Sequence, residues 1–484
     1  MALTKSVVVN FKGGIVTPGY LKEVLQAAAD ARIEAVRFGL RQQLIMDVPV
    51  SRIELFEKRC KERNICFEYK RHALPNIVSS YPAADIFIAD TWLREGVYKD
   101  VFDLFDYAPK LKVNICDSTQ QFVPLFTGHI NWVSSPSPHF WYLYIRLPNK
   151  QGVFRWKELI YTNDIANVSK QLEHFILMGV TNEQELFTQL QSTLVYNSKP
   201  AEYKLQLAHF SLPYYEGFNK NGNNWWLGIY RRDELFSVAF LMDVCEICMQ
   251  TKIGELYTTP WKSLIIKGIN SKHRLLWDKV LGKHRINVRH AANELNWQVE
   301  NEEGLILKRL IIRHFDKEDV RTYGLSFAVQ TKAKSLLFGS VIIRKEERKN
   351  PNRLQSYNRY SILYKKDFNP NAAEDILFRE HVEKDHIGTY LVSLCKLFYE
   401  LDNEPANVHS MINNIAPAEE TKTKVVYHCK HCFTVYDEAV GDETQSIAAG
   451  TLFNQLPAYY QCPTCEDNKD AFVAVNEKEL QMVF

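Results

Sequence analysis

The spacing of apolar residues near the N-terminus predicts a strand, a helix and two further strands. A short β-like run at residues 7–9 precedes residues 21–33, where apolar side chains recur at the three- and four-residue spacing of a helix face. A β-rich run at residues 35–40 follows, and residues 41–46 continue it after a turn. This order of patterns is typical of a small α+β unit.

A second set of the same patterns lies in the middle of the chain. Residues 227–230 form a β-like run, residues 235–247 have helical spacing, and residues 256–266 have the pattern of strand, turn and strand. The repeated order predicts an α+β body made of two related parts, residues 1–200 and residues 201–400.

The regular pattern stops after this body. Residues 401–424 have no apolar periodicity and are rich in Pro, Asn, Glu and Lys, which is typical of a tether. A flexible coil of this length would span roughly 25–30 Å on average. We therefore expect a linker here, followed by a separate C-terminal module at residues 425–484.

Composition places the chain among ordinary globular proteins. Of its 484 residues, 46% are hydrophobic and 24% are charged, and this length predicts about two to four domains. No run of apolar residues is long enough for a membrane span, and the N-terminal residues lack the features of a signal peptide. We expect a cytoplasmic protein without a membrane or nucleic-acid partner.

Charge is distributed unevenly between the body and the module. The module has three Lys and nine Asp or Glu residues, so it carries −6; the whole chain carries +2, and the rest therefore carries +8. This asymmetry is either ordinary surface variation or a basis for electrostatic docking or steering, which salt would weaken.

Two Cys-x-x-Cys pairs lie in the acidic module. Cys429 and Cys432 form one pair, and Cys462 and Cys465 form the other. Each turn of this kind directs two thiolates at one point, and two such turns complete a tetrahedral metal site. Spacing alone fits zinc as well as iron, since both metals accept four thiolates.

The residues between the two pairs resemble the rubredoxin family. The resemblance covers about residues 425–475 and is carried by residues 427–437, 447–453 and 460–465. It implies one mononuclear iron that cycles between the ferric and ferrous states and is held by all four cysteines. It also implies a small aromatic core, formed by Tyr427, Tyr436, Phe453, Tyr460 and Phe472.

Two positions depart from the rubredoxin pattern. Members of the family usually have glycine directly after the second cysteine of each pair, where φ is positive, but this chain has Phe433 and Glu466. A non-glycine residue at positive φ is strained. The carboxylate of Glu466 should also stabilise the ferric state and lower the reduction potential.

Short segments of the body resemble the nitrite and sulfite reductase family. They are residues 37–43, 76–80, 109–114 and 259–262. The resemblance implies a duplicated ferredoxin-like fold. It also implies that Arg41, Lys110 and Lys112 face an anion, either the siroheme carboxylates or bound nitrite or sulfite. Ordinary surface charge at strand ends is the alternative for these three residues.

The body lacks the cysteines that this family uses for its iron–sulfur cluster. Family members hold a [4Fe–4S] cluster bridged to siroheme through Cys-x5-Cys and Cys-x3-Cys in the second half, but residues 249–394 contain no cysteine. Thiolates are the usual ligands of such a cluster, so we expect no [4Fe–4S] cluster and no siroheme. Five other cysteines are expected to be buried as small apolar side chains: Cys60, Cys66, Cys116, Cys245 and Cys248.

One Glu-x-x-His step, from Glu383 to His386, occurs on a predicted helix. A di-iron helical bundle needs two such steps and further glutamates on long helices. We therefore interpret these residues as a solvated helix face.

Together these features predict an electron carrier, in which a rubredoxin is tethered to a reductase-like body without a redox centre of its own. No catalytic residue is assigned. The expected partners are a reductase as electron donor and an acceptor of the nitrite or sulfite reductase type. The alternatives are an enzyme whose body binds a tetrapyrrole through Arg41, Lys110 and Lys112, and a zinc-binding module without a redox role.

Overall fold

The chain divides into two compact units, residues 1–402 and residues 403–484. The computed structural model describes residues 3–88, 92–124, 127–148, 152–206, 208–213, 215–288, 293–332, 335, 337–346, 358–402, 425–431 and 434–476. The expected linker at residues 401–424 lies almost entirely outside the described residues. No helix in the described part of the chain is long and apolar enough to cross a membrane.

Two five-stranded sheets form the first lobe of the large unit. Their strand orders are β15-β3-β4-β1-β5 and β13-β14-β17-β16-β2. The first sheet contains β1 (Thr4–Asn10), β3 (Ala35–Phe38), β4 (Gln43–Pro49), β5 (Glu68–Tyr69) and β15 (Phe236–Ser237). The second contains β2 (Ile15–Val16), β13 (Gly217–Asn221), β14 (Asn224–Ile229), β16 (Leu256–Thr258) and β17 (Leu264–Asn270).

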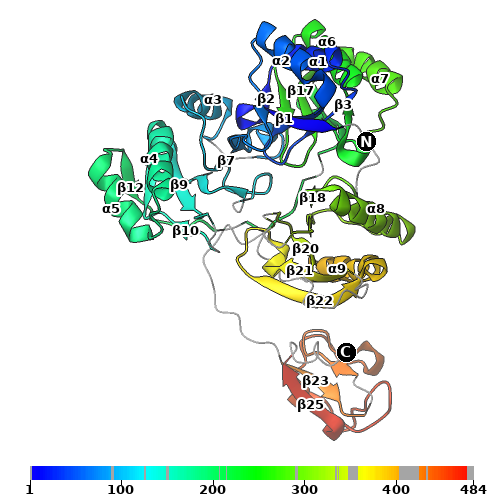
Figure 1. Cartoon of the computed structure of the whole chain (residues 1–484). Coiled ribbons are helices and arrows are strands. Elements are labelled where there is room, and N and C mark those ends of the chain that lie inside the picture. The colour runs from blue at the N-terminus through cyan, green and yellow to red at the C-terminus, as the bar shows by residue number, and fades with distance from the viewer. Residues whose placement is uncertain are drawn as a thin grey trace, which may run out of the picture. The chain divides into compact units, whose positions relative to one another are not determined.

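Four helices cover these two sheets: α1 (Pro18–Asp30), α2 (Ile53–Glu62), α6 (Val238–Gln250) and α7 (Arg274–Lys283). Figure 1 shows them gathered on the same side of the strands, where α1 packs against α6. The residues of α1 at helical spacing, Leu21, Val24, Leu25 and Ala28, are all buried in the shared core. The predicted helix therefore forms because its apolar face is covered by the sheets and by α6.

The two sheets are built from a repeated segment. The order strand, short strand, helix, strand, strand, helix occurs once from β1 to α2 and again from β14 to α7. The short strand of each copy pairs with the sheet formed by the other copy: β2 pairs with β16, and β15 pairs with β3. Residues with positive φ recur at an offset of about 220 residues: Gly13, Arg32, Gln42 and Asn64 in the first copy, and Asp233, Lys252, Lys262 and Arg285 in the second.

Each copy continues into a lobe with a sheet of its own. In the first, strands β6 (Val78–Ser79), β7 (Val113–Cys116) and β8 (Ile130–Ser134) are parallel. Antiparallel strands complete this sheet: β9 (Phe140–Ile145), β10 (Phe154–Arg155), β11 (Glu158–Tyr161) and β12 (Ser198–Pro200). Its helices are α3 (Glu95–Leu104), α4 (Ile165–Leu177) and α5 (Glu183–Thr193).

The corresponding lobe of the second copy follows the same plan. Strands β18 (Trp297–Val299), β19 (Phe327–Gln330) and β20 (Val341–Lys345) are parallel, and β21 (Arg359–Lys365) and β22 (Asp375–Glu383) are antiparallel. Its helices are α8 (Glu302–Lys317) and α9 (Ile387–Asp402). The predicted α+β duplication is therefore present in both lobes.

Two expectations about the large unit are wrong. Glu383 ends the edge strand β22, and His386 lies in the 3-10 turn that leads into α9, so the Glu-x-x-His step is not on a helix. Cys66 is exposed, whereas Cys60, Cys116, Cys245 and Cys248 are buried as expected. Cys66 lies beyond the end of α2, outside the face that the helix buries.

The small unit is a three-stranded sheet of order β24-β23-β25, made of β23 (Val425–Cys429), β24 (Val435–Tyr436) and β25 (Phe472–Asn476). Its core combines the rings of Tyr436, Tyr460 and Phe472 with two cysteines. Tyr427 stacks on Phe453 with ring centroids 4.0 Å apart. The aromatic core implied by the sequence is thus present.

Candidate functional site

Three cysteine sulfurs converge in the small unit. Cys429 ends strand β23, while Cys462 and Cys465 lie on the loop before β25, and the three Sγ atoms lie within 4.8 Å of one another. The Sγ atoms of Cys429 and Cys465 are 3.6 Å apart. Thiolates about 2.3 Å from a tetrahedrally bound metal lie about 3.8 Å from one another, so the spacing fits such a site. Cys432, the fourth expected ligand, lies outside the described residues.

The loop that carries two of these cysteines is closed by its own backbone. The amide of Cys462 donates to the carbonyl of Asp467 (2.7 Å), and the amide of Glu466 donates to the carbonyl of Cys462 (2.8 Å). Glu466 has a φ of +59°, so the expected left-handed residue after the second cysteine is present without glycine. Phe433, the other departure, lies outside the described residues.

Two side-chain contacts join the segments that carry the cysteines. The hydroxyl of Thr434 donates to that of Thr464 (2.8 Å), and His431 Nε2 lies 3.1 Å from the carboxylate of Asp467. Cys429 and Cys462 are buried, whereas Cys465 is exposed. A metal held here would lie in a braced site close to the surface, which suits exchange of an electron with a partner.

Arg41 is held in the large unit by carbonyl groups from three segments. Its guanidinium donates to the carbonyls of Asn76 (2.6 Å), Val113 (2.8 Å) and Thr127 (3.2 Å), and to the side-chain oxygen of Asn114 (3.2 Å). Burial lowers the pKa of Arg41, but a guanidinium stays protonated. Arg41 therefore contributes positive charge to its surroundings, while its donors are already engaged by neutral acceptors.

Lys112 forms a cationic cluster with Arg41 and Arg146, and the neutral ring of His129 contacts the backbone of Lys112. Burial lowers the pKa of Lys112 to about 8, and the charges of Arg41 and Arg146 add to this effect. Burial and the same cations lower the pKa of His129 to about 3, and its Nδ1 accepts from the amide of Lys112 (3.1 Å). His129 is therefore neutral at pH 7, and the lysine and arginines provide the charge. Lys110, the third expected residue, is exposed.

His129 and Arg146 were not predicted from the sequence. They flank the paired strands β8 and β9, where Ile130 lies opposite Ile145, and the amide of Arg146 donates to the carbonyl of His129 (2.8 Å). Both are therefore neighbours only because of strand pairing. The sequence does contain one signal for them: polar residues alternate with apolar ones at 129 and 131 and at 144 and 146, which is the pattern of strands with one polar face.

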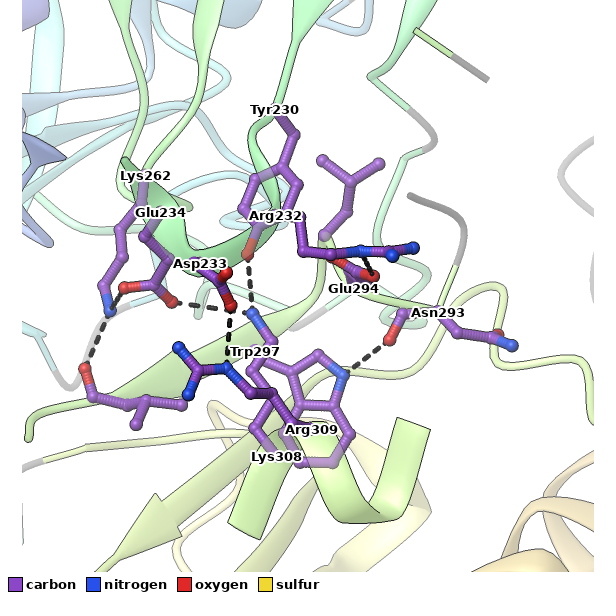
Figure 2. Close-up of polar contacts among 12 residues, drawn as sticks. Tyr230, Arg232, Asp233, Glu234, Lys262, Asn293, Glu294, Trp297, Lys308 and Arg309 are labelled. Atoms are coloured by element: carbon purple, nitrogen blue, oxygen red, sulfur yellow. Dashed lines mark hydrogen bonds and ion pairs between the residues drawn. The ribbon is translucent and has the colours of Figure 1, made fainter. Parts of the chain in front are cut away.

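A second set of charges is buried between the two lobes of the second copy. Figure 2 shows the amine of Lys308, on α8, between the hydroxyl of Tyr230 (2.6 Å) and the carboxylate of Glu234 (3.5 Å). Glu234 also pairs with Lys262, whose amine donates to the carbonyl of Val299 (2.8 Å). Glu234, Lys262 and Lys308 are each less than 10% exposed.

The residues of the first copy that correspond to Glu234 and Lys262 are uncharged. Gln42, the counterpart of Lys262, donates to the carbonyl of Ser79 (3.0 Å), as Lys262 does to that of Val299. Gly14 stands where the second copy has Glu234. The ion pairs therefore replace an amide and a glycine, and they connect the 3-10 turn before α6 with helix α8.

Comparison with known proteins gives a family for the small unit. The rubredoxin family model matches residues 426–472. Over 50 residues the chain is 52% identical to a rubredoxin of Megasphaera elsdenii. This alignment covers 10% of this chain and 94% of that protein. Over 52 residues it is 46% identical to the "Rubredoxin in uptake hydrogenase operon" of Azotobacter chroococcum mcd 1, covering 11% of this chain and 72% of that protein.

The large unit matches a solved structure in its fold. The structure of the Mycobacterium tuberculosis NirA protein aligns with a TM-score of 0.60 at 12% identity and covers 85% of this chain and 84% of that chain. This identity supports a shared fold and no more. The expected architecture, a duplicated α+β body followed by a C-terminal rubredoxin module, is confirmed.

Proposed function

Because the chain belongs to the rubredoxin family through its C-terminal unit, we propose that it is an electron carrier with one iron held by Cys429, Cys432, Cys462 and Cys465. The observation that carries the proposal is the convergence of three of these sulfurs at the spacing of a tetrahedral site. Bound there, iron supplies a one-electron ferric–ferrous couple.

The protein's own residues would keep the site rigid during electron transfer. The Thr434–Thr464 hydrogen bond and the His431–Asp467 pair brace the cysteine-bearing segments against each other. The backbone hydrogen bonds from Cys462 to Asp467 and from Glu466 to Cys462 would hold the second loop closed. A site that changes little on reduction exchanges electrons with little reorganisation, which is the property a carrier needs.

We further propose that the carrier acts in the cytoplasm and serves nitrite or sulfite reduction. The fold of the large unit supports this context, with a reductase as donor and an acceptor of the nitrite or sulfite reductase type. The acidic module, at −6, would favour partners with a basic docking surface.

An enzyme is the second candidate function, and the cationic cluster favours it. The electrostatic neighbours that lower the pKa of Lys112 are Arg41 and Arg146, both cations. Such a donor set fits the carboxylates of a tetrapyrrole or a small oxyanion. Lys112 and Arg146 would bind the anion. Arg41, whose donors are already engaged, would add positive charge without contacting the anion, and exposed Lys110 would attract the anion from solvent. The rubredoxin would then deliver electrons to this body.

A visible spectrum and metal analysis of the full-length protein separate these functions. The carrier predicts one iron per chain and iron–thiolate bands that bleach on addition of one electron. Cys465→Ser should abolish these bands, and Cys66→Ser, at an exposed cysteine outside the site, should keep them. A colourless protein with stoichiometric zinc, made with iron in supply, would contradict both functions.

Additional tetrapyrrole bands would support the enzyme. In that case Lys112→Met and Arg146→Met should weaken the tetrapyrrole bands and leave the iron–thiolate bands unchanged. If neither substitution changes the tetrapyrrole bands, the cationic cluster is not the binding site.

A further inference from the structure

A cavity of about 510 Å³ opens at the carboxyl ends of the parallel strands β7 and β8. Ser134 is the last residue of β8, and Ser118 lies two residues beyond β7; both line the cavity. In open α/β sheets, ligands bind outside the carboxyl ends of parallel strands. The volume is within the range of small-molecule sites. The cavity lies at the opposite end of these strands from Lys112 and His129.

Three aromatic side chains form part of its walls. The indole N–H of Trp92 donates to the carbonyl of Ser135 (2.8 Å), and its ring meets that of Trp141 edge to face, with centroids 5.3 Å apart. The hydroxyl of Tyr142 donates to the carbonyl of Tyr203 (3.0 Å) and so ties the connecting segment to the sheet. Trp92, Tyr142 and Tyr203 all line the cavity, and these contacts hold the rings of Trp92 and Tyr142 in position.

The charge around the cavity is positive. Lys204 lines it, and its described lining residues include no carboxylate. Arg155 is close enough to Tyr142 to oppose the rise in the pKa of that residue that burial causes. The Nη1 atom of Arg155 is buried without a hydrogen-bond partner among the described residues. Arg155 is not one of the described lining residues, so Lys204 is the group positioned to hold an anion in the cavity, and Arg155 adds positive charge near Tyr142.

We propose that this cavity binds a planar aromatic ligand that carries an anionic group. The ring lies against Trp92 and Tyr203, the serine hydroxyls contact its polar edge, and Lys204 holds the anion. The site uses none of the residues of the iron centre, so it stands or fails independently of the proposed electron transfer.

Equilibrium dialysis of the full-length protein against flavin mononucleotide tests the proposal, since this probe combines a planar ring with a phosphate. The wild type should bind it saturably, and riboflavin, which lacks the phosphate, should bind about tenfold more weakly. Tyr203→Ser, at a residue 70% exposed whose loss should not affect folding, should weaken both probes about tenfold. Lys204→Met should weaken flavin mononucleotide alone.

Tyr459→Ser is the matched control, because Tyr459 is 83% exposed and lies in the rubredoxin unit. It should bind both probes as the wild type does. No saturable binding up to about 1 mM, the weakest affinity of interest, would overturn the proposal. Unchanged affinity in both Tyr203→Ser and Lys204→Met would overturn it as well.

Discussion

The buried network of the second copy predicts a pH dependence of stability that one substitution, Lys308→Met, should remove. The side chain of Lys308 is 5% exposed, and its amine contacts the hydroxyl of Tyr230 and the carboxylate of Glu234. Burial lowers the pKa of Lys308 to about 8, although Glu234 opposes this shift. Methionine has a similar length and stays apolar, so it fills the same space without a titrating group.

The sign and size of the effect follow from the two protonation equilibria. An unfolded lysine titrates near a pKa of about 10.4, so between about pH 8 and about pH 10.4 the folded chain binds fewer protons than the unfolded chain. The free energy of unfolding therefore rises with pH across this window. Protonation of Lys308 opposes folding by about 3 kcal/mol at pH 7, and about 2 kcal/mol of this should be regained by about pH 9.5.

Urea unfolding followed by tryptophan fluorescence measures the effect. All nine tryptophans lie between residues 92 and 297, so the signal reports on the large unit. From about pH 7 to about pH 9.5 the free energy of unfolding of the wild type should gain about 2 kcal/mol more than that of Lys308→Met. Lys279→Met, at an exposed position of α7, should behave as the wild type does. Parallel pH curves for the wild type and Lys308→Met would refute the reasoning.

Three further substitutions test the network, the repeat and the metal centre. Glu234→Gln leaves Lys262 and Lys308 buried beside a neutral amide, and the same urea assay at pH 7 should show a loss of about 3–5 kcal/mol in the free energy of unfolding. Gly14→Ala places a methyl group 2.4 Å from Gln42 Nε2 at a φ of +83°, and should lower the free energy of unfolding by about 2 kcal/mol. Gly19→Ala, in helix α1 with nothing within 4 Å, should cause no loss in the same assay. Glu466→Gly removes a negative charge next to Cys465, so potentiometry should find a higher reduction potential; a potential equal to or below that of the wild type contradicts the argument.

The periodic elements of this fold are predictable from the sequence, because burial on one side leaves a pattern. Leu21, Val24, Leu25 and Ala28 all face the same core, and that shared face produces their helical spacing. The edge strand β22 is the opposite case. It is mostly exposed, so no alternation marks it, and a helix was predicted around Glu383.

The metal centre could be predicted from spacing along the sequence, whereas the cationic cluster could not. The four cysteines form two Cys-x-x-Cys pairs, and this local spacing is visible in a sequence. Arg41 instead meets carbonyls that are 35 to 86 positions away, and His129 meets Arg146 only through the register of β8 and β9. Contacts between distant segments leave no spacing to detect. Arg41 and Lys112 were therefore expected only from the family resemblance, and His129 and Arg146 became apparent only in the structure.

The divergence of the two copies limits where the body can bind an anion. Trp261 is the counterpart of Arg41, but it is fully buried and its indole N–H donates to the carbonyl of Phe122 (3.1 Å). The lysine beside it, Lys262, is neutralised by Glu234. A neutral indole and a paired lysine attract no anion, whereas Lys112 in the first copy has other cations as its electrostatic neighbours. The duplicated fold therefore supports a cationic site in its first copy and uses the equivalent position of the second to join two lobes.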